Sequence, residues 1–285
     1  MKRATLVLAF AAAAACGKAT PTGSSHPLFW SVEKDGKATY LLGTMHVGVD
    51  AVSKLPPEVW RKLDAAPVFA METDPADPAM QTLAAPSTGA TLHAQLGDDY
   101  WKKLETELTP ETAARLDHAK PMIAAVTLSV KGMPETEPMD GALEAVAVRE
   151  KKEIVFLEPA AKQLAILDKW LDIRTIKDLL DHPGQAAAHG SELLAAYLEG
   201  DLVKMITLAE SERATAKAAG FTDAEYDQEM AELLYDRNAS WIDAIEKLHT
   251  RGDGFVAVGA LHLIGERSVL DLLAHRGYAV TRVEP

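Results

Sequence analysis

The chain has 285 residues, of which 29 are basic and 42 are acidic, so its formal net charge is −13. Hydrophobic residues make up 48% and charged residues 25%, which is typical of a globular protein and excludes a wholly disordered chain. No segment is strongly basic, so nucleic acid is not an expected partner, because neutralising phosphates requires clustered Lys and Arg.

The first 16 residues have the pattern of a secretion signal. A basic start precedes an apolar run at 6–15, which is shorter than the roughly 20 residues that span a bilayer. Cys16 follows this run directly, in the position at which a bacterial lipoprotein is lipidated. We therefore expect export to the periplasm or cell envelope, with a lipid on Cys16 and a tether at 17–27 as the link to the membrane. Cleavage after Ala15 without lipidation is the alternative.

The chain from residue 28 onward begins with a predicted hairpin. Its two β-rich runs flank a turn at 34–37. The hydroxyl of Thr109 and the proline at 110 mark the start of a later helix. In chain order, we expect strands at 28–32 and 39–42, a helix at 57–63, a strand at 67–71, and helices at 100–108, from 110 onward and at 121–131.

The second half alternates in the same way. In chain order, we expect a helix at 141–151 capped by Asp140, a strand at 153–157, a helical stretch at 160–248 broken at 182–184 and 220, a strand at 255–258, a helix at 267–275 and a strand at 278–283. Helices between β-runs imply crossover connections and a parallel sheet. The predicted fold is therefore α/β, with a central, largely parallel sheet flanked by helices. We expect a single domain over 28–285, with helical insertions at 100–135 and 160–250.

Polar residues follow four of the predicted strands, at the point where each strand ends. They are His46, Glu72, Glu158 and His262. Ligands bind at the carboxyl ends of strands in parallel sheets, so we expect these side chains to share one edge. The order is His then Glu in the first half and Glu then His in the second. This order suggests two related halves that face each other across a cleft.

Both histidines end a G-x-x-H tetrapeptide, one starting at Gly43 and the other at Gly259. Glycine permits a tight turn directly after the strand, which can direct the histidine over the sheet edge. Imidazole beside carboxylates suits a first-row metal ion, or a general base if no metal binds. The alternatives are a surface histidine in an ordinary turn, and glutamates that only solvate strand ends or cap helices.

The remaining polar candidates have simpler interpretations. Asp74, like Asp140, is expected to be a helix N-cap rather than a ligand. Seven further histidines are expected at the surface: His26, His93, His118, His182, His189, His249 and His275.

Arg237 and Trp241 are four residues apart and share one helix face. In one interpretation, Trp241 packs in the core while Arg237 pairs with an acid. In the other, Arg237 enters the cleft as a fixed cation for a developing oxyanion. The residues alone favour the first interpretation.

Taken together, several segments resemble the TraB/GumN family. They are the G-x-x-H at 43–46, the strand and acid at 69–74, the segment 156–163, Arg237-Asn238 with Trp241, and the segment 255–265 with its closing 277–280. The similarity extends from about residue 28 to 283, and the paired motifs in this order make it specific.

The resemblance implies a fold related to erythromycin esterase and the haem-binding ChaN proteins. The family includes the TIKI proteins, which are metal-dependent proteases, and pheromone-shutdown proteins. The resemblance places His46, Glu72 and His262 as the metal or catalytic set, with Arg237 now expected in the cleft. The supporting residues that it implies are Gly43, Glu158, Asn238 and Gly259.

The expected function is an exported metal-dependent hydrolase that cleaves a peptide bond in a peptide or protein substrate. Mn²⁺, Co²⁺ or Zn²⁺ on His46, Glu72 and His262 would lower the pKa of a bound water. Arg237 would stabilise the oxyanion, and Glu158 would orient a histidine. Two alternatives stay open: a metal-free hydrolase with a histidine oriented by Glu72, and a non-catalytic protein that binds a peptide or haem. The oligomeric state is left open.

Overall fold

The structure, a computed structural model, describes residues 26–85 and 87–284. The predicted signal, the lipidation of Cys16 and all but the last two residues of the tether lie outside the described residues. Within the described ranges, every helix is too short or too polar to traverse a lipid bilayer.

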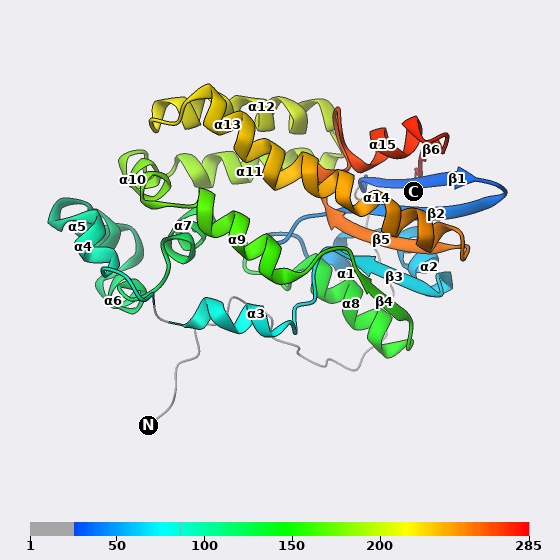
Figure 1. Cartoon of the computed structure of the whole chain (residues 1–285), viewed down its shortest axis with the longest axis horizontal. Coiled ribbons are helices and arrows are strands. Elements are labelled where there is room, and N and C mark those ends of the chain that lie inside the picture. The colour runs from blue at the N-terminus through cyan, green and yellow to red at the C-terminus, as the bar shows by residue number, and fades with distance from the viewer. Residues whose placement is uncertain (1–25, 86, 285) are drawn as a thin grey trace.

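A six-stranded sheet forms the centre of the fold (Figure 1). Its strands are β1 (Phe29–Lys34), β2 (Lys37–Thr44), β3 (Val68–Met71), β4 (Glu153–Phe156), β5 (Gly254–Gly259) and β6 (Ala279–Arg282), in the order β4-β3-β5-β2-β1-β6. The four strands β4, β3, β5 and β2 are parallel, and β1 runs antiparallel to both β2 and β6. The predicted α/β class with a largely parallel sheet is therefore confirmed, and the four strands followed by polar residues are neighbours.

The residues of these strands explain their positions in the sheet. β3 is buried along its whole length, and β5 along nearly all of it, which is typical of parallel strands covered on both faces. The β1–β2 hairpin turns at Asp35 and Gly36, which both have positive φ, as a two-residue primed turn requires.

The described residues before β4 form nine helical segments. They are α1 (Ala51–Lys54), α2 (Pro57–Ala65), α3 (Pro78–Gln81), η1 (Thr82–Ala84), α4 (Leu92–Leu96), α5 (Asp98–Leu108), α6 (Pro110–Leu116), α7 (Pro121–Ser129) and α8 (Met139–Arg149). As predicted, Thr109 caps α6, with its hydroxyl accepting from the N–H of Thr112.

The later helical segments include the long predicted insertion. They are α9 (Ala160–Trp170), α10 (Ile173–Asp181), α11 (Gln185–Glu199), α12 (Leu202–Ala218), α13 (Asp223–Met230), η2 (Ala231–Tyr235, a π-helical turn), α14 (Asp236–His249), η3 (Ala260–His262) and α15 (Val269–His275). The predicted breaks at 182–184 and 220 are confirmed. Two more breaks occur, where Asp172 and Asp201 cap new helices. The prediction that the helix is continuous between the expected breaks was therefore wrong.

The helices divide into those around the sheet and those beyond its edge (Figure 1). In this view α14 and α15 lie on one side of the sheet and α2 and α8 on the other, while α4 to α7 and α10 lie at the far end of the molecule. This far group has its own hydrophobic cluster, which includes Leu92, Leu104, Ile123 and Ile176. A separate, larger cluster surrounds the sheet. The insertion at 100–135 therefore packs with α9 and α10 in a cluster separate from the one around the sheet.

One histidine that we expected at the surface is buried. His249, in the last turn of α14, is 3% exposed and lies against the hairpin. Its Nδ1 is 2.9 Å from Thr39 Oγ1, and its Nε2 is 3.0 Å from the carbonyl oxygen of Lys34. These two partners satisfy the ring inside the core, so His249 has a structural role.

Candidate functional site

The carboxyl ends of the four parallel strands place the predicted side chains along one edge of the sheet. His46 lies two residues beyond β2, and Glu72 comes directly after β3. Glu158 lies two residues beyond β4, and His262 ends the short turn η3 after β5. The structure thus brings together segments that are up to 216 positions apart in the numbering.

Glu72 is buried and fully engaged. Its Oε1 accepts the N–H of Gly259 at 2.7 Å, and its Oε2 accepts from Arg237 Nη2 at 2.6 Å and from Gln163 Nε2 at 2.9 Å. Burial opposes its ionisation, but His262, His46, Arg237 and the Gly259 N–H outweigh this effect and lower the pKa of Glu72 to about 2. Arg237 is the permanent charge among them. Glu72 is therefore a fixed carboxylate at neutral pH.

Arg237 lies buried between two carboxylates. Its Nε donates to Glu158 Oε1 at 2.6 Å, and the Nη2 that contacts Glu72 also lies 2.6 Å from this Glu158 oxygen. Its Nη1 donates to the carbonyl oxygen of Leu233 at 2.9 Å. The same Nη1 is 3.2 Å from Nε2 of His262. Arg237 therefore pairs with acids, as in the simpler interpretation, and it also contacts His262. Its role toward an oxyanion stays a prediction. Glu158 accepts a hydrogen bond from the guanidinium of Arg237, so residues other than Glu158 orient the two histidines.

His262 is held in one orientation by two contacts. Its Nδ1 lies 2.6 Å from Asn238 Oδ1, and its ring centroid is 4.5 Å from that of Trp241. The Asn238 amide is itself positioned by a 3.0 Å bond to the carbonyl oxygen of Arg267, so its oxygen faces the ring and Nδ1 carries the proton. Burial lowers the pKa of His262 to about 4. The ring is neutral at pH 7, and the lone pair of its Nε2 faces Arg237.

The Arg-Asn-x-x-Trp element thus has a geometric explanation. Arg237, Asn238 and Trp241 lie in the first turns of α14 and all contact the same imidazole. The guanidinium also lies 4.9 Å from the Trp241 ring centroid. The π-helical turn η2 comes directly before α14, and such turns often occur beside functional sites.

His46 has an opposite environment, because its side chain is 63% exposed. Its Nδ1 is 2.7 Å from Asp140 Oδ2, and the other oxygen of Asp140 accepts from Thr44 Oγ1 at 2.8 Å. The negative charge of Asp140 raises the pKa of His46 to about 9. The prediction that Asp140 caps α8 is therefore wrong. Pro138 occupies the cap position, and Asp140 lies inside the first turn, where it orients His46.

Gly43 and Gly259 are required for space and not for a left-handed turn. Neither has positive φ, and both lie in strands, β2 and β5, which corrects the predicted reason for these glycines. A Cβ at position 43 would lie 3.0 Å from Ala260 Cα. A Cβ at position 259 would lie 3.3 Å from Glu72 Oε1, 3.5 Å from His262 Cδ2 and 3.6 Å from His46 Nε2. The three predicted ligands therefore converge around Gly259.

The donor atoms at this point fit a divalent metal by their chemistry. They are His46 Nε2, His262 Nε2 and Glu72 Oε1, a set that suits first-row ions. Each imidazole also has its Nδ1 held by an acceptor, as metal-binding histidines do. Among the described residues, no three His, Cys, Asp or Glu side chains form a preassembled ligand cluster. Arg237 Nη1 contacts the Nε2 that His262 would use, so an ion would have to replace this contact.

Comparison with known proteins agrees with the motifs. The model of the TraB/PrgY/gumN family matches residues 28–282. The chain belongs to this family. Similar curated proteins include two named "Uncharacterized protein YbaP", from Shigella flexneri and from Escherichia coli (strain K12). Both are 26% identical to the chain, over 82% of its length and 87% of theirs. No solved structure matches the chain. The predicted TraB/GumN resemblance is thus confirmed.

Three residues of this TraB/PrgY/gumN site had no predicted role in it. They are Asp140, Gln163 and Tyr197. Tyr197, buried in α11, donates to the carbonyl oxygen of Gly43 at 2.8 Å, and burial raises its pKa. The sequence pattern could have indicated the role of Asp140, because this residue shares the buried face of α8 with Leu143 and Ala147 at helical spacing. An acid on an apolar face needs a buried partner. No local pattern indicated Tyr197.

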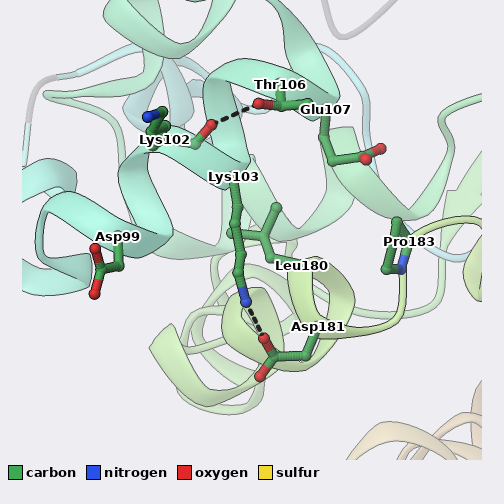
Figure 2. A pocket seen from close by; sticks show the side chains of 8 residues that line it. All are labelled: Asp99, Lys102, Lys103, Thr106, Glu107, Leu180, Asp181 and Pro183. Atoms are coloured by element: carbon green, nitrogen blue, oxygen red, sulfur yellow. Dashed lines mark hydrogen bonds and ion pairs between the residues drawn. The ribbon is translucent and has the colours of Figure 1, made fainter.

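A separate pocket of about 410 Å³ lies in the helical insertions, between α5 and the end of α10 (Figure 2). Figure 2 shows Lys103 reaching Asp181 across it, with Lys102 and Glu107 on α5. None of the predicted site residues lines this pocket. It is not part of the sheet-edge site.

Proposed function

We propose that this TraB/PrgY/gumN protein is an exported hydrolase that cleaves a peptide bond at the sheet edge. One observation carries the proposal: His46 Nε2, Glu72 Oε1 and His262 converge around Gly259, next to the buried guanidinium of Arg237. Paired histidines, a fixed carboxylate and an immobile cation supply the parts that acyl transfer to water requires.

His46 is the residue that a substrate meets first. Its ring is exposed, while Asp140 holds Nδ1 and leaves Nε2 directed at Gly259. Nε2 would accept a proton from the attacking water and return it to the leaving amine. Because its pKa is raised to about 9, only the small deprotonated fraction of His46 can accept this proton at neutral pH, so the rate of the base-catalysed step should increase as the pH rises toward 9.

Arg237 supplies positive charge in a site with little water. Glu72 and Glu158 fix the guanidinium, so it does not reorganise as charge develops. Its Nη1 lies toward His262 and would stabilise the oxyanion of the tetrahedral intermediate. Asn238 and Trp241 keep the His262 ring beside it.

His46, His262 and Glu72 would hold the divalent metal, for which Mn²⁺, Co²⁺ and Zn²⁺ are the candidates. When bound, the ion supplies Lewis acidity and a water of lowered pKa.

A metal-free hydrolase is the second candidate, and a specific contact favours it. Arg237 Nη1 already donates to His262 Nε2, which leaves His46 with Asp140 as the available acid and base. Glu72 forms no hydrogen bond to either histidine among the described residues, so Asp140 takes the orienting role that we had expected of Glu72.

The test is cleavage of a defined peptide mixture, followed by mass spectrometry, with added Mn²⁺, Co²⁺ or Zn²⁺ and after exhaustive chelation. We expect cleavage by the wild type and by the control variant His275→Ala, whose histidine is exposed on α15, and none by His46→Ala. Activity that persists after chelation, with no metal in the purified protein, supports the metal-free candidate. If no peptide is cleaved under any condition, hydrolysis is rejected. Retention of a peptide, or a visible absorbance band with haem, would then support a binding function.

Export and anchoring are part of the same proposal. The apolar run at 6–15 followed by Cys16 supports them. We expect the mature protein to begin at a lipidated Cys16 and to sediment with membranes, whereas Cys16→Ser should release it. An unprocessed amino terminus in the mature protein would contradict export.

A further inference from the structure

A cavity of about 800 Å³ lies among the helices of the long insertion, apart from the sheet-edge site. α10, α11, α12 and α13 supply most of its wall. Its apolar lining includes Leu171, Leu179, Leu208, Phe221, Tyr226 and Met230. Its volume is within the usual range for small-molecule sites of about 300–1,000 Å³. The cavity is large enough for a ligand with a substantial apolar body.

The charged lining of this cavity has one sign. The acids are Asp178, Glu192, Glu212 and Glu229. Among the described residues that line it, none is Lys or Arg. Two of the acids have histidine partners, since Asp178 lies 3.2 Å from His182 and Glu212 lies 3.0 Å from His189. The lining therefore has an excess of negative charge beside apolar surface.

Of the two described lining acids without a histidine partner, Glu192 is exposed and Glu229 is half-buried. Glu229 is therefore the relevant carboxyl. It is half-buried on α13, and within the described structure its carboxyl forms no hydrogen bond or ion pair. Burial raises its pKa to about 7, and the nearby Arg174 does not offset this effect. A half-buried carboxyl in an apolar wall costs stability when it ionises, unless a cation lies beside it. A cationic ligand would therefore be favoured at this position.

We propose that the cavity binds a small amphiphilic organic cation, with its apolar body between the helices and its ammonium group against Glu229. The pocket in Figure 2 is the contrasting case, because Lys102 and Lys103 line it and Lys103 pairs with Asp181. The pocket in Figure 2 contains its own cations, whereas no Lys or Arg of the described chain lines the 800 Å³ cavity, so the carboxyl of Glu229 is left for a ligand.

The cavity adjoins the sheet-edge site but does not overlap it. Leu233, in η2, lines the cavity, and its carbonyl oxygen accepts from Arg237. No residue that we place in the hydrolytic site lines the cavity. Ligand binding here can therefore be tested, and can fail, independently of peptide hydrolysis.

The test is isothermal titration calorimetry of the full chain at pH 7.5 with three ligands that share one apolar body. They are decylamine, decanol and decanoate, each kept below the concentration at which it aggregates. We expect one decylamine per chain, bound about tenfold more tightly than decanol because of the charge pair, with decanoate weakest. Equal affinities for decylamine and decanoate would overturn the proposal.

Two variants locate the binding and one controls for charge. Glu229→Gln keeps the shape and should weaken decylamine about tenfold while leaving decanol unchanged. Glu210→Gln removes an exposed acid of α12 that does not line the cavity, and it should have no effect. Ala216→Phe fills the cavity from α12 and should weaken decylamine and decanol together. Unchanged decylamine binding in either Glu229→Gln or Ala216→Phe would overturn the proposal.

Discussion

The two G-x-x-H segments end adjacent parallel strands, yet their histidines have opposite surroundings. The side chain of His46 is 63% exposed and that of His262 is 5% exposed. Each ring is held through Nδ1, but the acceptor is a carboxylate, Asp140, in one case and an amide, Asn238, in the other. Trp241 packs on His262 only.

Because of this difference in surroundings, the two imidazole rings carry different charges at neutral pH. The pKa of His46 is raised to about 9 by Asp140, and that of His262 is lowered to about 4 by burial. At pH 7, His46 is protonated and His262 is neutral. The strand-end motif determines where each imidazole lies, and the neighbouring residues determine what it can do. Two titratable groups with pKa values pushed apart are the usual basis for assigning an acid and a base.

Removing the guanidinium of Arg237 should change the contrast between the two histidines most strongly, because Arg237 contacts His262 directly and pairs with two buried carboxylates. Arg237→Ala leaves Glu72 and Glu158 buried without their cation, which should lower the free energy of unfolding by about 3–5 kcal/mol. Urea denaturation measures this. The control is Arg251→Ala, which breaks a solvent-exposed pair with Glu153 and should have little effect on the free energy of unfolding. A similar small loss for Arg237→Ala would mean that the buried network does not stabilise the fold.

Truncating the two histidines tests the contrast in burial directly. His262→Ala removes a ring packed on Trp241 and leaves Asn238 Oδ1 unsatisfied, so we expect a loss of about 2–4 kcal/mol in the free energy of unfolding. His46→Ala removes an exposed ring together with the cation that pairs with Asp140, so we expect a smaller loss than for His262→Ala. The same urea titrations compare them. Equal losses would contradict the assigned environments.

The glycines of the two segments should differ in a related way. A Cβ at Gly43 meets the backbone of Ala260 at 3.0 Å, and a tightly packed backbone yields with difficulty. We expect Gly43→Ala to lower the free energy of unfolding by about 1–3 kcal/mol. Gly259→Ala meets side-chain atoms at 3.3 Å or more, one of them on the exposed His46, and should cost less. Thermal unfolding of the two variants measures which substitution costs more stability. A larger loss for Gly259→Ala than for Gly43→Ala would refute the packing argument.

The sequence was sufficient for the sheet because its signals were local. The continuous apolar runs of β3 and β5, and a polar residue after each parallel strand, predicted both the strands and their common edge. His46, Glu72, Glu158 and His262 do lie there. The relation between the two halves of the chain stays a prediction.

What the sequence did not predict depends on contacts between distant segments. Asp140 stands directly before the helix predicted at 141–151, a position that favours capping, and its partnership with His46 spans 94 positions. Glu158 and Asn238 could be placed near the site, but their partners depend on how α14 crosses the sheet edge. The environment of Glu229 likewise depends on the packing of four helices. Periodicity contains no information about these distances.

Replacing Asp140 should test the contrast between the pKa values of His46 and His262 with the smallest change in structure. In Asp140→Asn the charge that raises the pKa of His46 is gone, so this pKa should fall from about 9 toward the ordinary value of 6.5, and that of His262 should stay low. A raised histidine pKa stabilises the fold fully below pH 6.5, and this contribution is lost as pH rises through 9. The wild type should therefore exceed the variant in stability by more at pH 6 than at pH 9.5. NMR titration of the imidazole resonances, with Glu137→Gln as an exposed control, measures the pKa values, and an unchanged His46 pKa in Asp140→Asn would remove Asp140 from its orienting role.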